Sequence, residues 1–342
     1  MLSFTILFEK YFHPISSLIF VTTGSTIEIN LSVKFNELND FNYELNPDGT
    51  GYTLTKITDE NFVGDTMEIP TQHNGLPVTK VTARPSLKKV KELVVPAGIT
   101  ITSSSFANST SLQKVTLAEG ITRIESGMFS GCTNLSDVTL PSSIEYIGSN
   151  AFSKTAIKTI TIPKGTISSE AFTDCELLEE IYIGQNVTNI SSGFAKNCYN
   201  LKKLVVDENN STYNSSTRND YILQTATGTL VQAISTTQLD NNVIIIKAGS
   251  FSNGCPETIT IPRTLTQIEY NGRFNFTTVY IEDLKAWLNI SFNMSGNTAS
   301  NPLDNAEYVY INNQAIGIGY TVDNFITSTA AGTGKNEAIR RL

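Results

Sequence analysis

The chain has 342 residues, of which 40% are hydrophobic, so it is long enough to bury a sizeable core. Its formal net charge is −8, which argues against a partner bound by neutralising phosphates, such as a nucleic acid. Only 16% of the residues are charged, compared with about 25% in average soluble domains, and Ser, Thr and Asn fill the difference. This composition favours a protein that faces the outside of a cell.

Residues 1–40 form an N-terminal segment that is rich in apolar residues. Glu9, Lys10 and His13 interrupt it, and the uncharged stretch that begins at Pro14 is shorter than the ~20 residues that a membrane-spanning helix needs. A secretory signal would carry its positive charge first and end in a small-residue cleavage site, and neither is clear here. We therefore predict no stable transmembrane span. A degenerate signal or anchor, a buried strand or cap, and a misplaced start codon are the alternatives.

Residues 41–89 are predicted to hold a hairpin and a degenerate first repeat. The stretch "YELNPDGTGYTLTKI" places Asp48 and Gly49 in a turn between two strand-like runs, which indicates a β-hairpin. The stretch "MEIPTQHNGLPVTKV" follows it and has the apolar spacing of an imperfect repeat unit.

Residues 90–206 repeat the template L-x-x-V-x-L at intervals of 21–23 residues, which indicates a solenoid of stacked units. Apolar residues at the fourth and sixth template positions have the period of a short strand. Pro96, Pro141 and Pro163 end three of these strands, because proline cannot donate a further ladder hydrogen bond. The templates begin at Val90, Leu112, Leu135, Ile157, Leu178 and Leu201.

Each regular unit also has a second apolar cluster, in which Phe follows Ile after four or five residues. We predict a turn that runs into one turn of helix, with the Phe pointing into the core. Cys132, Cys175 and Cys198 each stand three residues before a template, which indicates small apolar side chains at one level of the core. A disulfide between Cys175 and Cys198, in adjacent units, is conceivable. The Ile–Phe pairs are Ile124–Phe129, Ile147–Phe152, Ile167–Phe172 and Ile190–Phe194.

A single unit buries too few side chains to offset the entropy lost on ordering it, so stability must come from stacking. The predicted fold is therefore a β-rich repeat solenoid. We expect a leucine-rich-repeat right-handed superhelix with one long parallel sheet and short helical turns on the opposite side. Both open ends of such an array need covers, and residues 1–89 and the tail after about residue 316 are the candidates.

Residues 207–316 continue the repeat less regularly. We predict an inserted hairpin in residues 207–234, with "ATG" as the turn between "YIL" and "LVQAI", and a short amphipathic helix in "EDLKAWLNI" (282–290). "VIIIKAGSFSNGC" and "ETITIP" resume the repeat between these two segments. Residues 317–342 match nothing in the pattern and form a divergent C-terminal tail.

The repeat resembles the BspA-type leucine-rich repeats. The resemblance rests on stretches such as "VTLPSSIEYIGSNAF", "FSGCTNLSDVTLP" and "VYIEDLKAWLNISF", in which the strand, the Ile-Gly-x-x-Ala-Phe cluster and the Cys recur in phase. It covers roughly residues 41–316. Members of that family are typically surface or secreted proteins of gut and oral bacteria and of some protists, and are associated with adhesion. The resemblance implies an extracellular or cell-surface location and a protein or glycan partner.

The strongest candidate for a functional site is the outward face of the strands. The third and fifth template positions point away from the core and form two rows along the sheet. Opposite charges adjoin in the first row, and the second is rich in threonine. The candidate binding face comprises Lys114, Thr116, Asp137, Thr139, Thr159, Thr161, Glu180, Tyr182, Lys203 and Tyr280, the two tyrosines being the natural aromatic anchors. The alternative interpretation is that these side chains pair with one another and with water on an exposed sheet and bind no ligand.

No catalytic, cofactor-binding or metal-ligating set is predicted. The two histidines, His13 and His73, lie outside the regular repeats, and no P-loop, H-E-x-x-H, G-x-S-x-G or G-x-G-x-x-G pattern occurs. We therefore expect a non-catalytic, adhesin-like protein that binds a protein or glycan of a host or cell surface.

Two other interpretations stay open. The chain could be a structural spacer with no ligand of its own. It could also be an enzyme whose site lies in residues 207–234 or 280–316, near the carboxylates of Glu282, Asp283 and Asp304.

Overall fold

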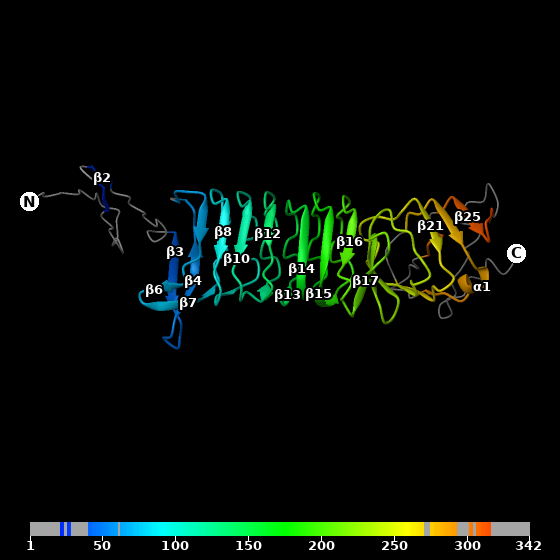
Figure 1. Ribbon diagram of the computed structural model, residues 1–342, viewed down its shortest axis with the longest axis horizontal. Helices are drawn as coiled ribbons and strands as arrows, with labels where there is room; N and C mark the ends of the chain where they lie inside the picture. The colour runs from blue at the N-terminus through cyan, green and yellow to red at the C-terminus, as the bar shows by residue number, and fades with distance from the viewer. Residues whose placement is uncertain are drawn as a thin grey trace, which may run out of the picture.

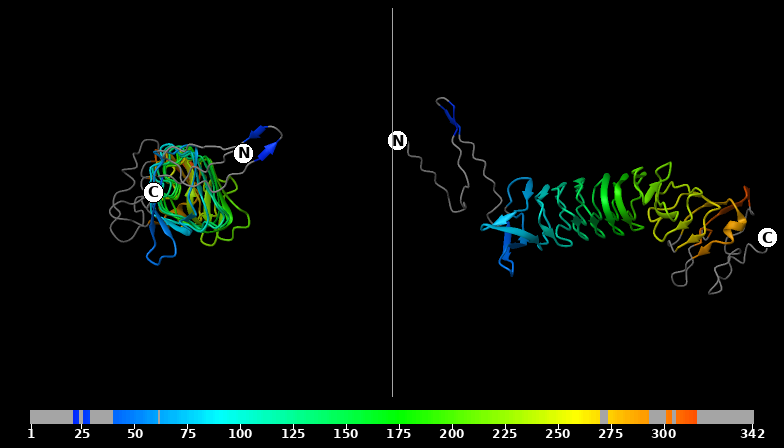
Figure 2. Two further views of the ribbon diagram at one scale, coloured as in Figure 1. Left: turned by 90° about the vertical axis from the view of Figure 1, so that its left-hand side faces the viewer. Right: turned by 60° about the horizontal axis from the view of Figure 1, so that its bottom comes forward.

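The computed structural model describes residues 21–23, 26–28, 40–60, 62–269, 274–292, 301–303 and 306–315. The chain winds into an elongated solenoid whose strands stand side by side across its long axis (Figures 1 and 2). In the N-terminal segment, β1 (Val21–Thr23) and β2 (Thr26–Glu28) pair antiparallel. The divergent tail predicted at residues 317–342 lies outside the described residues.

The template residues form the first ladder of parallel strands, as predicted. Burial alternates along each strand: in β10, Val115 and Leu117 are buried, whereas Lys114 and Thr116 are exposed. The ladder comprises β5 (Thr66–Glu68), β8 (Glu92–Val95), β10 (Lys114–Leu117), β12 (Asp137–Thr139), β14 (Thr159–Ile167), β15 (Glu180–Ile190), β16 (Lys203–Val206), β21 (Thr258–Ile261), β23 (Thr278–Ile281) and β25 (Tyr308–Ile311).

The ladder is divided among three sheets instead of running as one long sheet. The first division falls between β12 and β14, which are neighbours but share no ladder pairing. The turn before β14 is one residue shorter than the turn before β12. Ile157 follows Phe152 by five positions, whereas Leu135 follows Phe129 by six. Here the Ala156 N–H bonds the Leu135 carbonyl at 2.9 Å, outside the strands. The second division falls at the inserted hairpin.

A second parallel ladder, which the repeat template does not predict, runs through the Ile residues of the second apolar cluster. Most of its strands have only two residues, too few to show a periodic pattern. Its separate strands are β9 (Thr100–Ile101), β11 (Arg123–Ile124), β13 (Tyr146–Ile147), β20 (Ile245–Ile246), β22 (Gln267–Ile268) and β24 (Ser291–Phe292). The C-terminal halves of β14 and β15 belong to the same ladder.

The prediction of one turn of helix after each of these Ile residues is wrong. The chain forms non-helical hydrogen-bonded turns at these positions. The Phe129 N–H bonds the Ala151 carbonyl of the next unit at 2.8 Å, and the Phe152 N–H bonds the Ala171 carbonyl at 2.9 Å. Backbone donors committed to a neighbouring unit cannot make the i→i−4 bonds of a helix. The turns are therefore held between units rather than within them.

Phenylalanines and cysteines fill the core at fixed levels. The rings of Phe106, Phe129, Phe152 and Phe172 stack in sequence, with centroids 5.9, 5.6 and 5.4 Å apart. Cys132, Cys175 and Cys198 are buried free thiols, in agreement with their predicted role. Each thiol also donates to the carbonyl of a core phenylalanine in the preceding unit, the acceptors being Phe106, Phe152 and Phe172.

The hairpin predicted near the N-terminus is confirmed. β3 (Phe41–Leu45) and β4 (Tyr52–Ile57) pair antiparallel around the turn that holds Asp48 and Gly49. β6 (Gln72–His73) and β7 (Leu76–Val81) form a second hairpin, and β7 pairs parallel with β4 and with β9. The N-terminal hairpins therefore extend the second ladder and cover its first turn.

The inserted hairpin is also confirmed, and it crosses the core. β17 (Tyr213–Ser215), β18 (Tyr221–Gln224) and β19 (Thr229–Ala233) pair antiparallel. Ile222 and Val231 belong to the core of the regular repeats, whereas Leu223 and Leu230 belong to a second core nearer the C-terminus. The hairpin is thus buried on both faces and separates two hydrophobic cores.

The predicted helix is present but shorter than expected. α1 (Leu284–Trp287) is the only α-helix in the described part of the chain. Asp283 caps it by accepting from the Ala286 N–H at 2.9 Å, and Trp287 is buried in the second core. β26 (Gln314–Ala315) pairs antiparallel with β25 and ends the described solenoid.

Candidate binding face

The two outward rows predicted from the template have the expected register. Lys114 pairs across the ladder with both Glu92 and Asp137, and Thr116 pairs with Val94 and Thr139. In the next sheet Thr159, Glu180 and Lys203 continue the first row, while Thr161, Tyr182 and Val205 continue the second. Parallel strands about 4.8 Å apart therefore present these side chains at a regular spacing.

Glu92 organises the first half of the face. Its carboxylate accepts from Lys114 Nζ at 3.1 Å, from Thr116 Oγ1 at 3.2 Å and from Thr66 Oγ1 at 3.3 Å. The hydrogen bond from Lys114 is the largest influence that lowers the pKa of Glu92 below its ordinary value. Asp137, on the other side of Lys114, is exposed and makes no ion pair with any described residue.

Glu180 organises the second half in the same way. Lys203 Nζ donates to its carboxylate at 2.8 Å, and the Tyr182 hydroxyl donates to the other oxygen at 2.5 Å. The bond from Lys203, followed by that from Tyr182, lowers the pKa of Glu180, and the carboxylate in turn raises the pKa values of Tyr182 and Lys203. Tyr182, one of the two predicted aromatic anchors, therefore already uses its hydroxyl in a hydrogen bond within the face.

The predicted face residues fall into three groups. Lys114, Thr116, Asp137 and Thr139 lie on the sheet of β10 and β12, and a second group lies on β14, β15 and β16. Tyr280 lies on β23, in a different sheet beyond the inserted hairpin, so the structure does not bring it next to Tyr182 (Figure 1). The second group contains Thr159, Thr161, Glu180, Tyr182 and Lys203.

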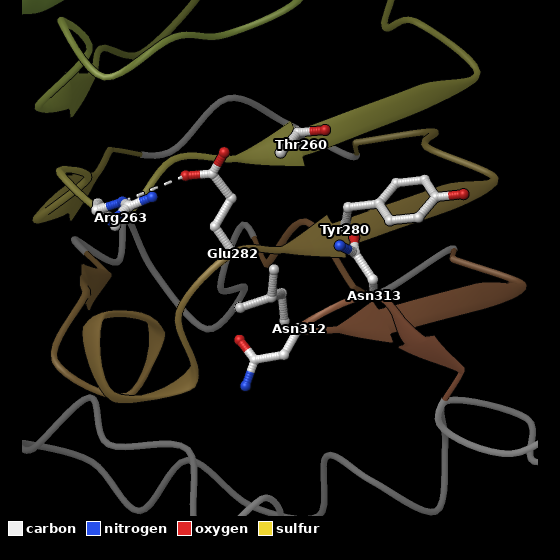
Figure 3. Close-up of a pocket in the computed structure, with 7 residues that line it drawn as sticks. Thr260, Arg263, Tyr280, Glu282, Asn312 and Asn313 are labelled. Atoms are coloured by element: carbon white, nitrogen blue, oxygen red, sulfur yellow. Dashed lines mark ion pairs between the residues drawn. The ribbon is translucent and has the colours of Figure 1, made fainter.

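Tyr280 lines a pocket of about 410 Å³ at the C-terminal end of the solenoid (Figure 3). Its ring stacks on that of Tyr310 with centroids 4.6 Å apart and an interplanar angle of 14°. Arg263 Nε and Glu282 Oε2 form an ion pair at 3.7 Å on one side of the pocket, away from the Tyr280 ring (Figure 3). Thr260, Asn312 and Asn313 also line the pocket.

Two residues of this pocket were named from the sequence, Tyr280 as an aromatic anchor and Glu282 as a carboxylate of a possible enzyme site. The residues not foreseen include Thr260, Arg263, Asn312 and Asn313. The stretch "YVYINNQ" could have revealed two of them, because two asparagines between strand-like runs indicate a two-residue hairpin turn. The position of Arg263 carries no such signal, because it follows from how β21 and β23 stack.

Of the three carboxylates considered for an enzyme, the two that the structure describes have other roles. Glu282 pairs with Arg263, and Asp283 caps α1. Asp304 lies outside the described residues. His73 stacks on Tyr43 with centroids 3.9 Å apart, at the N-terminal end of the solenoid and in an aromatic cluster.

Among the residues that the structure describes, no group of three or more His, Cys, Asp or Glu side chains could hold a metal ion. Within the same residues, no helix has both the length and the hydropathy needed to cross a bilayer.

The family model for the BspA type leucine rich repeat region matches residues 99–220 and 230–316, with six copies. The chain belongs to this family. The resemblance inferred from the repeated motif is thereby confirmed, and BspA-type repeats account for both sides of the inserted hairpin. Leucine-rich repeats of this family are generally non-catalytic. Among curated proteins, no sequence matches the chain significantly.

Solved structures of other leucine-rich repeat proteins have the same fold as this BspA-type chain. One from Eubacterium ventriosum has 17% sequence identity and a TM-score of 0.55, covering 80% of this chain and 70% of its own. One from Bacteroides ovatus has 19% identity and a TM-score of 0.53, with the same coverage. The pneumococcal vaccine antigen PcpA has 15% identity and a TM-score of 0.53, covering 81% of this chain and 85% of its own.

Proposed function

We propose that the chain is a non-catalytic, adhesin-like binding protein that acts at a cell exterior and recognises a protein or a glycan with the outward surface of its solenoid. The observation that carries this proposal is the candidate binding face. Strand pairing presents charged, hydroxyl and aromatic groups at a regular spacing, and the inner strands β10, β14 and β15 are hydrogen-bonded to a neighbour on each side. Preorganised side chains lose little entropy when they bind, which favours recognition.

The chemistry of the described carboxylates supports a non-catalytic role. General acid–base catalysis of bond cleavage needs positioned groups that converge on one site. Glu282 and Asp283, the described carboxylates considered for an enzyme, have different partners, since Glu282 pairs with Arg263 and Asp283 caps α1. The composition and the typical location of family members support a cell exterior as the place of action.

A binding screen of the purified chain against matrix proteins and glycans tests the proposal. The variant Tyr182→Ala, Lys203→Glu removes the aromatic ring and reverses the charge on the second half of the face, so we expect at least tenfold weaker binding. Lys196→Glu is the matched control: Lys196 pairs with Glu170 at 3.1 Å on the turn side of the solenoid, away from the two rows. A partner whose affinity is the same for both variants would contradict recognition by this half.

A structural spacer is the second candidate function, and one observation favours it. Lys114 and Lys203 are paired with Glu92 and Glu180 within the face, so these charges need no external partner. A spacer predicts that substitutions in the face are silent in every binding assay, whereas the binding role predicts at least one partner that is sensitive to them.

A further inference from the structure

The pocket beside Tyr280 has an aromatic ring at its edge with open space before one face of that ring. Tyr280 pairs in the ladder with Tyr310 on one side and Thr260 on the other. Tyr310 covers one face of the Tyr280 ring by stacking. The other face is turned toward Thr260, whose side chain is too small to cover it, and Tyr280 and Thr260 both line the pocket.

The charges in this pocket cancel. Arg263 and Glu282 are its charged lining residues, and they carry opposite signs. Their separation of 3.7 Å is longer than the 2.8 Å between Lys203 and Glu180, so both groups keep hydrogen-bonding capacity for a third partner. A pocket without net charge favours an uncharged ligand over an anion or a cation.

The hairpin turn of β25 and β26 adds two amides. Asn312 and Asn313 have φ values of 50° and 63°, so both occupy the left-handed region, as a type I′ turn requires. Glycine is the residue that adopts this conformation at least cost, yet both positions carry a side chain that lines the pocket. Neither amide bonds another described side chain, so each offers donors and an acceptor to a ligand.

We propose that this pocket binds a neutral saccharide, with the apolar face of one sugar ring on Tyr280 and its hydroxyls on Asn312, Asn313 and the Arg263–Glu282 pair. Sugar hydroxyls both donate and accept, which matches side-chain amides and a loosely joined ion pair. The volume of about 410 Å³ lies at the low end of the range for small-molecule sites and suits one or two sugar units. This inference rests on the proposed binding function and assigns a ligand class to one part of the surface.

Saturation-transfer NMR and calorimetry on the full chain test the inference. The probes are methyl glycosides of glucose, galactose and mannose, N-acetylglucosamine, and sialyllactose as the charged comparison. We expect at least one neutral probe to bind, with transfer strongest to the ring C–H protons that face Tyr280, and with sialyllactose no tighter. Binding of no neutral probe, or a preference for sialyllactose, would overturn the assignment.

Three variants locate the binding. Asn313→Gly keeps the turn geometry, because glycine accepts the left-handed conformation, and we expect it to weaken binding at least fivefold with no loss of thermal stability. Tyr280→Ala is expected to abolish binding, and Tyr280→Phe to retain most of it through the ring. Tyr199→Ala, at an exposed tyrosine outside this pocket and outside the two rows of the candidate binding face, is the control that leaves saccharide affinity unchanged. Unaltered affinity in Asn313→Gly and Tyr280→Ala would overturn the site.

The test separates this inference from the binding function on which it rests. If no neutral probe binds but the chain still captures a matrix protein in the screen, only the saccharide assignment fails. If neither sugars nor proteins bind, both fail and the spacer is favoured. Capture of a protein that Asn313→Gly abolishes would make the pocket a protein site and would also overturn the saccharide assignment.

Discussion

At the scale of single residues, Glu180 shows how the face is held together. One carboxylate accepts from Lys203 on the next strand and from Tyr182 on its own strand. Because both groups stabilise the ionised form, the pKa of Glu180 in the folded protein lies below its ordinary value. Because its pKa is lowered, Glu180 stabilises the fold at pH values above the pKa that it has in the unfolded chain. This contribution disappears as the pH falls through the pKa that it has in the folded protein.

We therefore expect substitutions of its partners to raise the pKa of Glu180. Lys203→Met removes the largest cause and should give the larger increase, and Tyr182→Phe removes only the hydroxyl and should give the smaller one. NMR titration of the side-chain carboxyl carbons measures both values. Glu92 is an internal control. Its lowered pKa depends on Lys114, and both residues lie in a different sheet from Glu180, so the pKa of Glu92 should not change.

The cysteines give a second test at this scale. Burial raises the pKa of Cys132 to about 12, so its reactive thiolate is scarce at neutral pH. Cys132, Cys175 and Cys198 are buried, whereas Cys255 is partly exposed.

We expect iodoacetamide at pH 8 to modify Cys255 in the native protein and the other three only after unfolding, as read by mass spectrometry of tryptic peptides. Early modification of Cys175 or Cys198 would mean that the core opens locally under native conditions.

At the scale of elements, close approach of neighbouring turns decides which residues fit. A Cβ added to Gly148 would lie 2.5 Å from the backbone nitrogen of Ser126 and 2.8 Å from its Cα. Backbone atoms can yield only if the two turns separate, which would weaken the hydrogen bond at 2.8 Å from the Gly148 N–H to the Ile124 carbonyl. The glycine of the quoted cluster "IGSNAF" is thus required by packing between units.

Gly148→Ala should lower the free energy of unfolding by about 1–3 kcal/mol, as overpacking typically does. Urea denaturation followed by circular dichroism measures the loss. Ser168→Ala is the matched control: Ser168 follows Ile167 as Gly148 follows Ile147, and its position already accommodates a Cβ. Equal losses in the two variants would show that this contact does not limit the stacking.

The sequence predicted some elements better than others, for physical reasons. The template strands could be predicted because apolar and polar residues alternate along them. In β10, for example, Val115 and Leu117 mark the buried face within four residues. The second ladder could not, since a strand such as Ile245–Ile246 has no period to detect. The turns were mistaken for single turns of helix because the sequence between Ile and Phe shows a compact turn but does not show that its backbone donors bond the next unit.

At the scale of the whole molecule, the inserted hairpin divides the core. Alternate residues of β18 and β19 belong to different cores, with Val231 in the first and Leu230 in the second. The run "YIL" with "LVQAI" is nearly continuous in apolar residues, which is typical of strands buried on both faces. That signal was available, but which cores the two faces contact depends on the three-dimensional stacking.

Leu230→Ala and Val231→Ala should therefore destabilise different halves of the solenoid. Leu→Ala in a core typically costs about 2–5 kcal/mol, and each cavity opens into one core only. Hydrogen exchange read by mass spectrometry should show faster exchange mainly in residues 243–269 for Leu230→Ala. For Val231→Ala the effect should fall mainly in residues 178–206. Similar acceleration on both sides in both variants would mean that the two cores unfold as one.

The candidate face was predictable only where it follows the repeat. The pairing of Glu180 with Lys203 follows from template register and opposite charge, both of which can be read from the sequence. The pocket beside Tyr280 depends on a left-handed turn at Asn312 and Asn313, some thirty residues later in the chain, and on the stacking that brings Arg263 opposite Glu282. Proximity of this kind arises from the fold and not from spacing along the chain.

The direction of the ladder hydrogen bonds has a mechanical consequence. The strands lie across the long axis, so the bonds that join neighbouring turns point along it (Figure 1). Tension applied between the two ends would pass through all the turns in series, and the bonds would break one turn after another rather than all at once. The antiparallel hairpin, packed into both cores, would interrupt this sequence midway. A solenoid built in this way would extend gradually under load rather than fail at one point.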